Sequence, residues 1–91
     1  MKEYFDREEI KKHHKENDCW IICSEKVYNI TELINKHPGG KNCLLKRGGG
    51  CIDCLTDYKF HSKNAKKEWE KYCIGYTKEY KYSNKKFCNI I

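Results

Sequence analysis

The chain has 91 residues, of which 38% are hydrophobic and 35% charged, and its formal net charge is +6. This length suits one small domain with little apolar material for a core. The nineteen basic residues are scattered among thirteen acidic ones, a pattern of a solvated surface that argues against a nucleic-acid-binding protein.

The N-terminus and the cysteines bear on where the protein works. Residues 1–7 are charged and lack the apolar stretch of a secretory signal, and no run reaches the length of a membrane span. Seven cysteines in such a chain indicate free thiols in a reducing compartment rather than a disulfide framework. We therefore expect a soluble cytoplasmic monomer without a transmembrane segment.

The first third of the chain predicts one helix followed by two strands. Asp6 with Glu9 three positions later resembles a capping box, which would open a charged helix reaching about Lys15. Residues 19–23 are an apolar run typical of a buried strand. Residues 26–30 alternate polar and apolar side chains as a half-buried strand does.

Short helices follow. Thr31 is expected to cap a helix that stops before Pro38, and residues 41–47 predict another, with Cys43 and Leu44 facing inward, that ends at a run of three glycines. Residues 51–59 predict a third. Ser62 is expected to cap a fourth helix, whose inward face carries Ala65, Trp69 and Tyr72.

The end of the chain divides into a strand and a tail. Residues 73–76 predict a strand, which closes a domain of residues 1–77, and the Lys- and Tyr-rich residues 78–91 predict a flexible tail. Cys88 stands fourth from the end, as in a C-terminal prenylation signal, and lysines precede it. Against that interpretation, Asn89 is not aliphatic and Ile91 is an atypical last residue. Lipidation of Cys88 with peripheral membrane contact therefore stays an alternative.

Two histidines 24 positions apart are the most informative feature. Proline disfavours the α conformation of the residue before it, so His37 should end its helix in an extended geometry, and Gly39 and Gly40 leave room for a bulky ligand. Imidazole alone does not select a metal, but iron in a porphyrin needs only two protein ligands and an apolar slot. His61 would be the second ligand. His13 and His14, on the charged helix, are expected to be ordinary surface residues.

In register with this pair, several stretches resemble the cytochrome b5 haem-binding domain. They are residues 20–22, 26–31, 33–34, 37–40, 49–50, 61–62, 65 and 74–75. The resemblance covers about residues 4–76. It implies an α+β, cytochrome b5-like fold in which a small mixed sheet carries two helix pairs that form the haem pocket.

The same resemblance implies a site. His37 and His61 would be the axial ligands of a non-covalent b-type haem, with Pro38, Gly39 and Gly40 shaping the turn and Ser62 helping to hold a propionate. The pocket would be lined by Leu33, Leu44, Ala65, Trp69 and Tyr72.

The function that this site implies is electron transfer without catalysis. With both axial positions filled there is no open coordination position, which leaves one-electron chemistry at the iron. The chain would be an electron carrier rather than an enzyme. The family implies a flavin-dependent reductase as donor and a haem or iron protein as acceptor.

Some residues depart from the family pattern. Thr56 stands where the family has a pocket phenylalanine, Lys59 replaces an apolar residue and Phe60 a glycine. Lys41 and Asn42 replace acidic residues after the Pro-Gly-Gly turn. We therefore expect haem to bind with an altered potential or affinity, and a weakened acidic docking surface.

Other readings stay open. A haem- or ligand-binding module without electron transfer is one, although the steroid-binding relatives of this fold lack the paired histidines. Cys51 and Cys54 have the spacing of a thiol pair or of zinc ligands with His61. Leu55 argues against covalent c-type attachment, which needs histidine directly after the second cysteine.

Overall fold

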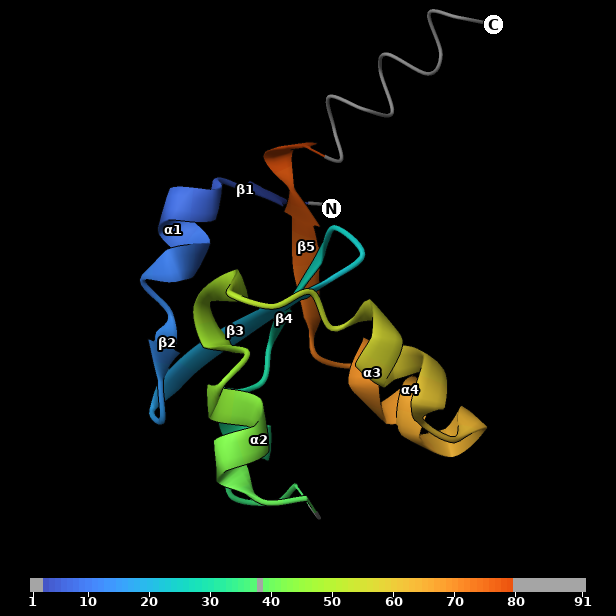
Figure 1. Cartoon of the computed structure of the whole chain (residues 1–91). Helices are drawn as coiled ribbons and strands as arrows, with labels where there is room; N and C mark the ends of the chain where they lie inside the picture. The colour runs from blue at the N-terminus through green and yellow to red at the C-terminus, as the bar shows by residue number, and fades with distance from the viewer. Residues whose placement is uncertain (1–2, 38, 80–91) are drawn as a thin grey trace, which may run out of the picture.

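A five-stranded mixed sheet organises the computed structural model, which describes residues 3–37 and 39–79 (Figure 1). The strand order is β1-β5-β4-β3-β2; β1 pairs parallel with β5, and the other neighbours are antiparallel. Their bounds are β1 (Tyr4–Phe5), β2 (His14–Lys15), β3 (Asp18–Cys23), β4 (Lys26–Asn29) and β5 (Cys73–Thr77). The predictions on Pro38, Cys88 and most of the tail fall outside the described residues.

The helices group beside the sheet. They are α1 (Arg7–Lys11), α2 (Lys41–Leu45), α3 (Leu55–Phe60) and α4 (Lys63–Glu70), with 3-10 turns η1 (Thr31–Leu33) and η2 (Gly48–Gly50). Figure 1 shows α2 on one side of an open end of the molecule and α3 with α4 on the other. The predicted α+β class is confirmed. Among the described residues, no helix has the length and apolar character needed to cross a bilayer.

The core lies on both faces of the sheet. On β3, Cys19, Ile21 and Cys23 belong to the larger buried cluster, and Ile22 belongs to a smaller cluster behind it, as a period of two requires. Neighbouring strands flank β4 on both edges, and its Val27 and Tyr28 are buried in opposite clusters. The strand predicted there is confirmed, but the expected half burial was wrong, because both faces of β4 are covered.

The first helix is shorter than predicted. α1 ends at Lys11, and Asp6, although at the N-cap position, makes no side-chain cap hydrogen bond. The capping box was wrong because the Glu9 carboxylate turns toward His13 instead, at 2.9 Å from Nε2. Beyond the helix, the carbonyl of His13 accepts hydrogen bonds from the N–H groups of Trp20 and Gly49, so the backbone at residue 13 is bonded to β3 and η2 rather than within a helix.

Three other predicted elements also differ. The Thr31 hydroxyl accepts from the Cys19 N–H at 3.0 Å and bonds Asn29 at 2.7 Å, so it caps no helix and only η1 forms. Helix α2 is shorter than residues 41–47, and Cys43 is exposed rather than inward. Residues 51–54 are not helical, because Asp53 forms a β-bridge with Ile22.

His13 is a structural residue rather than a surface one. Its ring stacks on Trp20 with centroids 3.6 Å apart, and its Nδ1 lies 2.7 Å from the Asp18 carboxylate. Burial lowers its pKa, but the hydrogen bonds and charges of Glu9 and Asp18 outweigh that effect, and the pKa is raised above its ordinary value. Two carboxylates therefore hold the His13 ring against an indole face and favour its protonated form.

This arrangement makes stability depend on pH. A raised pKa in the folded state gives a contribution that is complete below about pH 6.5 and is lost as pH rises through the folded value. We expect the free energy of unfolding in urea to fall between pH 6 and pH 8.5 in the native chain, and to fall less in His13→Gln. His14→Gln, which removes an exposed histidine, is the matched control, and its free energy of unfolding should fall over this pH range as much as that of the native chain. An equal fall in the native chain and in His13→Gln would contradict the prediction.

Candidate functional site

The two histidines of the sequence pair lie opposite each other. The rings of His37 and His61 have centroids 6.5 Å apart and planes inclined by 37°. Two metal–nitrogen bonds of about 2 Å, with each nitrogen about 1.1 Å from its ring centre, require about 6.3 Å. The separation therefore suits one metal ion between the rings, with one imidazole on each side.

Two cavities open from this gap, and both histidines line each of them. The inner cavity, of about 80 Å³, is otherwise lined by Ile21, Cys43, Leu44, Arg47, Cys54, Asp57 and Trp69. The outer one, of about 410 Å³, is otherwise lined by Leu33, Gly39, Ala65 and Glu68. A flat group held between the rings would extend into both cavities, against mostly apolar walls.

His61 is already oriented as a ligand. It follows α3 in an extended conformation, and its Nδ1 lies 2.6 Å from the carbonyl oxygen of Asp57. Because a carbonyl only accepts, Nδ1 must donate, which leaves Nε2 unprotonated with a free lone pair. The ring also meets Trp69 edge to face at 4.9 Å. Tautomer and orientation are thus both set before any metal arrives.

His37 is held differently. The Gly39 N–H donates to its Nδ1 at 3.2 Å, which places the proton of a neutral ring on Nε2. Binding a metal through Nε2 therefore requires this hydrogen bond to be given up. The ring also lies against Gly39 so closely that a Cβ there would sit 2.9 Å from His37 Cε1. Glycine is needed at this position to admit the imidazole.

An ion pair that the sequence did not indicate joins the two sides of the site. Arg47, after α2, makes a two-pronged contact with Asp57 of α3, at 2.7 Å and 3.1 Å. The hydrogen bonds that Arg47 donates to the Asp57 carboxylate raise the pKa of the guanidinium. Since the Asp57 carbonyl orients His61, this pair ties the position of a histidine to the opposite wall. No local signal reveals it, because the intervening loop sets the approach.

Trp69 brings a polar group to the inner cavity. Its Nε1 is buried and has no hydrogen-bond partner among the described residues. Its ring meets Tyr58 and Tyr28 edge to face, at 5.2 Å and 6.1 Å. Because a buried donor usually finds a partner, the indole has hydrogen-bonding capacity left for a ligand.

The cysteines do not form the alternative zinc or thiol site. Residues 3–37 and 39–79 contain no group of three or more His, Cys, Asp or Glu side chains able to hold a metal ion, and their six cysteines are free. Burial raises the pKa of Cys54 to about 12, so its thiol stays protonated and is a poor nucleophile or ligand. Cys51 is exposed and directs its sulfur to the Gly48 carbonyl.

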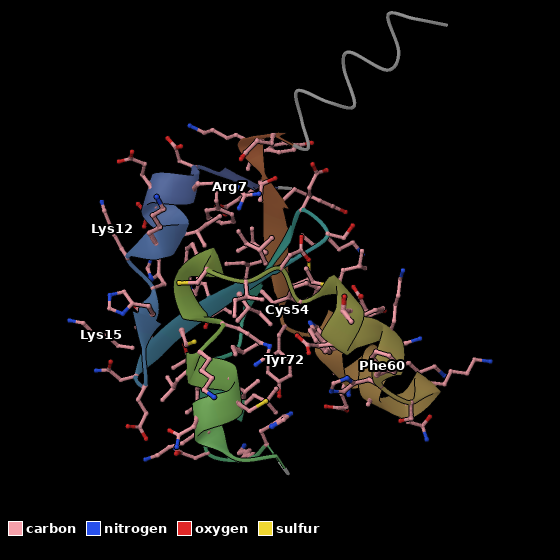
Figure 2. All side chains as sticks on the ribbon, in the orientation of Figure 1. Arg7, Lys12, Lys15, Cys54, Phe60 and Tyr72 are labelled. Atoms are coloured by element: carbon pink, nitrogen blue, oxygen red, sulfur yellow. The ribbon has the colours of Figure 1, made fainter. Side chains whose placement is uncertain are left out.

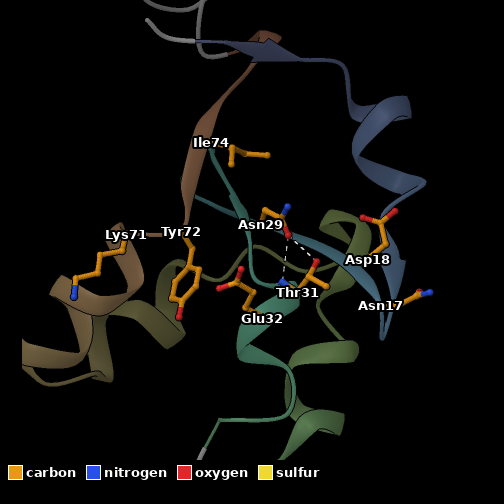
Figure 3. A pocket seen from close by; sticks show the side chains of 8 residues that line it. All are labelled: Asn17, Asp18, Asn29, Thr31, Glu32, Lys71, Tyr72 and Ile74. Atoms are coloured by element: carbon orange, nitrogen blue, oxygen red, sulfur yellow. Dashed lines mark hydrogen bonds between the residues drawn. The ribbon is translucent and has the colours of Figure 1, made fainter.

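The other residues predicted for the pocket divide into three groups. Those that line the cavities with the histidines are Leu33, Gly39, Leu44, Ala65 and Trp69. Gly40 precedes α2 with a φ of 90°, and the Ser62 hydroxyl caps α4 by accepting from the Ala65 N–H at 3.2 Å. Tyr72 is not brought to this site: it lines a separate, open depression beside Asn29, Thr31 and Ile74 (Figure 3).

Comparison with known proteins places this geometry in a family. The profile of the cytochrome b5-like haem/steroid binding domain matches residues 6–78. The chain belongs to the cytochrome b5 family. Cytochrome b5 isoform C of Arabidopsis thaliana is 45% identical over 69 residues, which are 74% of this chain and 51% of that protein. The chain thus spans about half the length of that cytochrome b5.

Two further relatives show where such domains occur. The nitrate reductase [NADPH] of Phytophthora infestans is 39% identical over 69 residues, 75% of this chain but only 7% of the enzyme. The solved structure of cytochrome b5 of Ostreococcus tauri virus 2 has a TM-score of 0.67 and 31% identity, covering 79% of this chain and 81% of that one. Cytochrome b5 domains are thus found both alone and within enzymes.

Cytochrome b5 domains bind haem b. The residues present fit that group. The two facing imidazoles match the span of one iron, the cavities on both sides of them are mostly apolar, and Gly39 leaves the room that the His37 ring needs. The iron would need no third protein ligand, in agreement with the absence of a larger donor cluster among the described residues.

Proposed function

We propose that His37 and His61 are the two axial ligands of haem b and that the chain is an electron carrier, not an enzyme. It takes single electrons from a flavin-dependent reductase and passes them to a haem or iron acceptor protein. The observation that carries the proposal is the 6.5 Å between two facing imidazole centroids, which leaves no free coordination position on an iron between them.

The chain's own residues have distinct tasks in this function. Bound haem supplies a one-electron change at its iron. His61, oriented by the Asp57 carbonyl, and His37 hold the group from opposite sides. Leu33, Leu44 and Ala65 would exclude water from its faces, and Ser62 would help to hold a propionate.

The setting of the carrier is also part of the proposal. The chain would act as a cytoplasmic monomer.

Titration of the apoprotein with haemin tests the ligand assignment. We expect a sharp end point at one haemin per chain, a Soret band that shifts on reduction, and no change when carbon monoxide is added to the reduced protein. Carbon monoxide needs a free axial position, so its ready binding would contradict ligation by both histidines. A spectrum that never departs from free haemin would contradict haem binding itself.

A further inference from the structure

Charge is distributed unevenly over this chain. Residues 31–71, which contain both histidines and every helix around the cavities, carry nine basic and five acidic side chains, a net charge of +4. Residues 3–30, which form most of the sheet and α1, carry five basic and seven acidic side chains, a net charge of −2. The histidine end of the molecule is therefore its positive end.

The lysines nearest the cavities are free to meet a partner. Five exposed lysines each lie within two positions of a residue that lines a cavity, and no ion pair joins them to another described residue; we call them the basic rim. They are Lys36, Lys46, Lys59, Lys63 and Lys67.

Most acidic groups around the same cavities are already engaged. Asp57 pairs with Arg47, Glu68 with Lys71, and Glu70 with Lys26. Asp53 accepts backbone hydrogen bonds from Ser24 and Leu55. Glu32, next to Leu33, is exposed and lies outside these pairs. Five lysines outside these pairs thus outnumber one such glutamate, and the field at the mouth of the site is positive.

An exposed aromatic residue lies within the basic rim. Phe60, between Lys59 and His61, is 85% exposed, and Figure 2 shows it at the α3–α4 pair. Such a side chain is costly to leave in water and is typical of the central anchor of a protein interface. The other exposed large apolar residues, Ile52 and Leu55, are only 48% and 37% exposed and lie toward the start of α3. One phenylalanine is too little for a membrane-inserted face, which needs a broad apolar stripe.

We propose that the basic rim and Phe60 form the docking surface for an acidic redox protein, whose carboxylates surround a small apolar recess. Positive and negative surfaces would steer the encounter, and Phe60 would place the partner within one residue of His61. The inference rests on the proposed electron-carrier function and adds to it the charge class of the partner.

The rate of electron transfer from the reduced holoprotein to two small oxidants of opposite charge tests whether the electrostatic field at the mouth of the site is positive. With anionic ferricyanide we expect the rate to fall as ionic strength rises, and with cationic tris(phenanthroline)cobalt(III) we expect it to rise. Lys46→Glu/Lys59→Glu should slow oxidation by ferricyanide about tenfold or more at low salt. Poly-L-glutamate, a soluble acidic polypeptide, should slow ferricyanide oxidation of the native chain but not of this variant.

The matched control is Lys11→Glu/Lys15→Glu, which makes the same change in net charge on α1 and β2; Lys15 and Phe60 lie on opposite sides of Figure 2. At an ionic strength of about 0.1 M, where the Debye length is about 10 Å, its ferricyanide rate should change less than about twofold, because charges on α1 and β2 are then screened from the histidine end. Equal effects of the two variants would overturn the proposal, since only net charge would then matter. Loss of haem from the rim variant would also overturn it, by assigning the lysines to the propionates.

A third arm separates a protein partner from a membrane. Phe60→Ala should change the effect of poly-L-glutamate only slightly. Neither the native chain nor this variant should bind phosphatidylserine vesicles. Binding of the native chain to those vesicles with loss in Phe60→Ala would overturn the proposal in favour of a lipid surface. A chain that takes up no haem or cannot be reduced would instead refute the proposed function, before any rate is measured.

Discussion

His61→Ala is expected to abolish stable haem binding, and His37→Ala to weaken it while leaving a protein that binds carbon monoxide. The reason lies in the two different hydrogen bonds of the rings. His61 Nδ1 donates to the Asp57 carbonyl, so its Nε2 is ready to bind iron, whereas His37 must first give up the Gly39 N–H. Outer partners of a ligand are worth about 10- to 100-fold in metal affinity, so loss of the better ligand itself should exceed about 100-fold.

Haemin titration followed by carbon monoxide addition measures both effects. His14→Ala is the control, because His14 is exposed on β2 and lies on neither cavity. It should keep the native affinity and stay insensitive to carbon monoxide. Equal haemin affinities of His37→Ala and His61→Ala would contradict the expected difference between the two ligands. Native haemin affinity and insensitivity to carbon monoxide in either variant would show that its histidine does not bind the iron.

Tyr28→Ala should be the most destabilising single change in the apoprotein. Tyr28 is 1% exposed on the central strand β4, and its ring meets Trp69 edge to face. Truncating a buried aromatic ring costs about 3–5 kcal/mol. Small domains have about 5–15 kcal/mol of stability in total. Urea unfolding should therefore show a partly unfolded apoprotein at room temperature.

Two variants separate packing from hydrogen bonding. Tyr28→Phe keeps the ring but removes the hydroxyl, which donates to Glu70 at 3.2 Å, and should cost about 1–2 kcal/mol. Phe60→Ala removes an aromatic ring that is 85% exposed and should leave the unfolding curve unchanged. If Phe60→Ala lowered the free energy of unfolding as much as Tyr28→Ala does, the burial of the ring would not be what determines the destabilisation.

Elements with strong local signals were predictable from sequence. The apolar run of β3 and the Ser62 cap of α4 form as expected, because each depends on residues a few positions apart. Elements that depend on distant partners were not. α1 stops early and the His13 carbonyl bonds the Gly49 N–H, far along the chain. Residues 51–54 are not helical because Asp53 pairs with Ile22, across some thirty positions.

The site divides in the same way. His37, with its Pro-Gly-Gly turn, and His61, before a cap, carried enough sequence signal to be paired, and the structure brings their rings together. The Arg47–Asp57 contact and the unpartnered Trp69 N–H depend on how three short segments approach one another. Tyr72 was predicted at the site and does not line it. Its helical spacing from Ala65 and Trp69 indicated the same face, but α4 ends at Glu70 and Tyr72 lines another depression.

The parallel pairing of β1 with β5 has a practical consequence. It brings the first and last described strands together at the pole of the molecule away from α2, α3 and α4 (Figure 1). An electrode linker, a fluorophore or a fused domain joined directly after residue 79 would therefore attach at the far pole. The molecule could then be immobilised at that pole without covering the histidines.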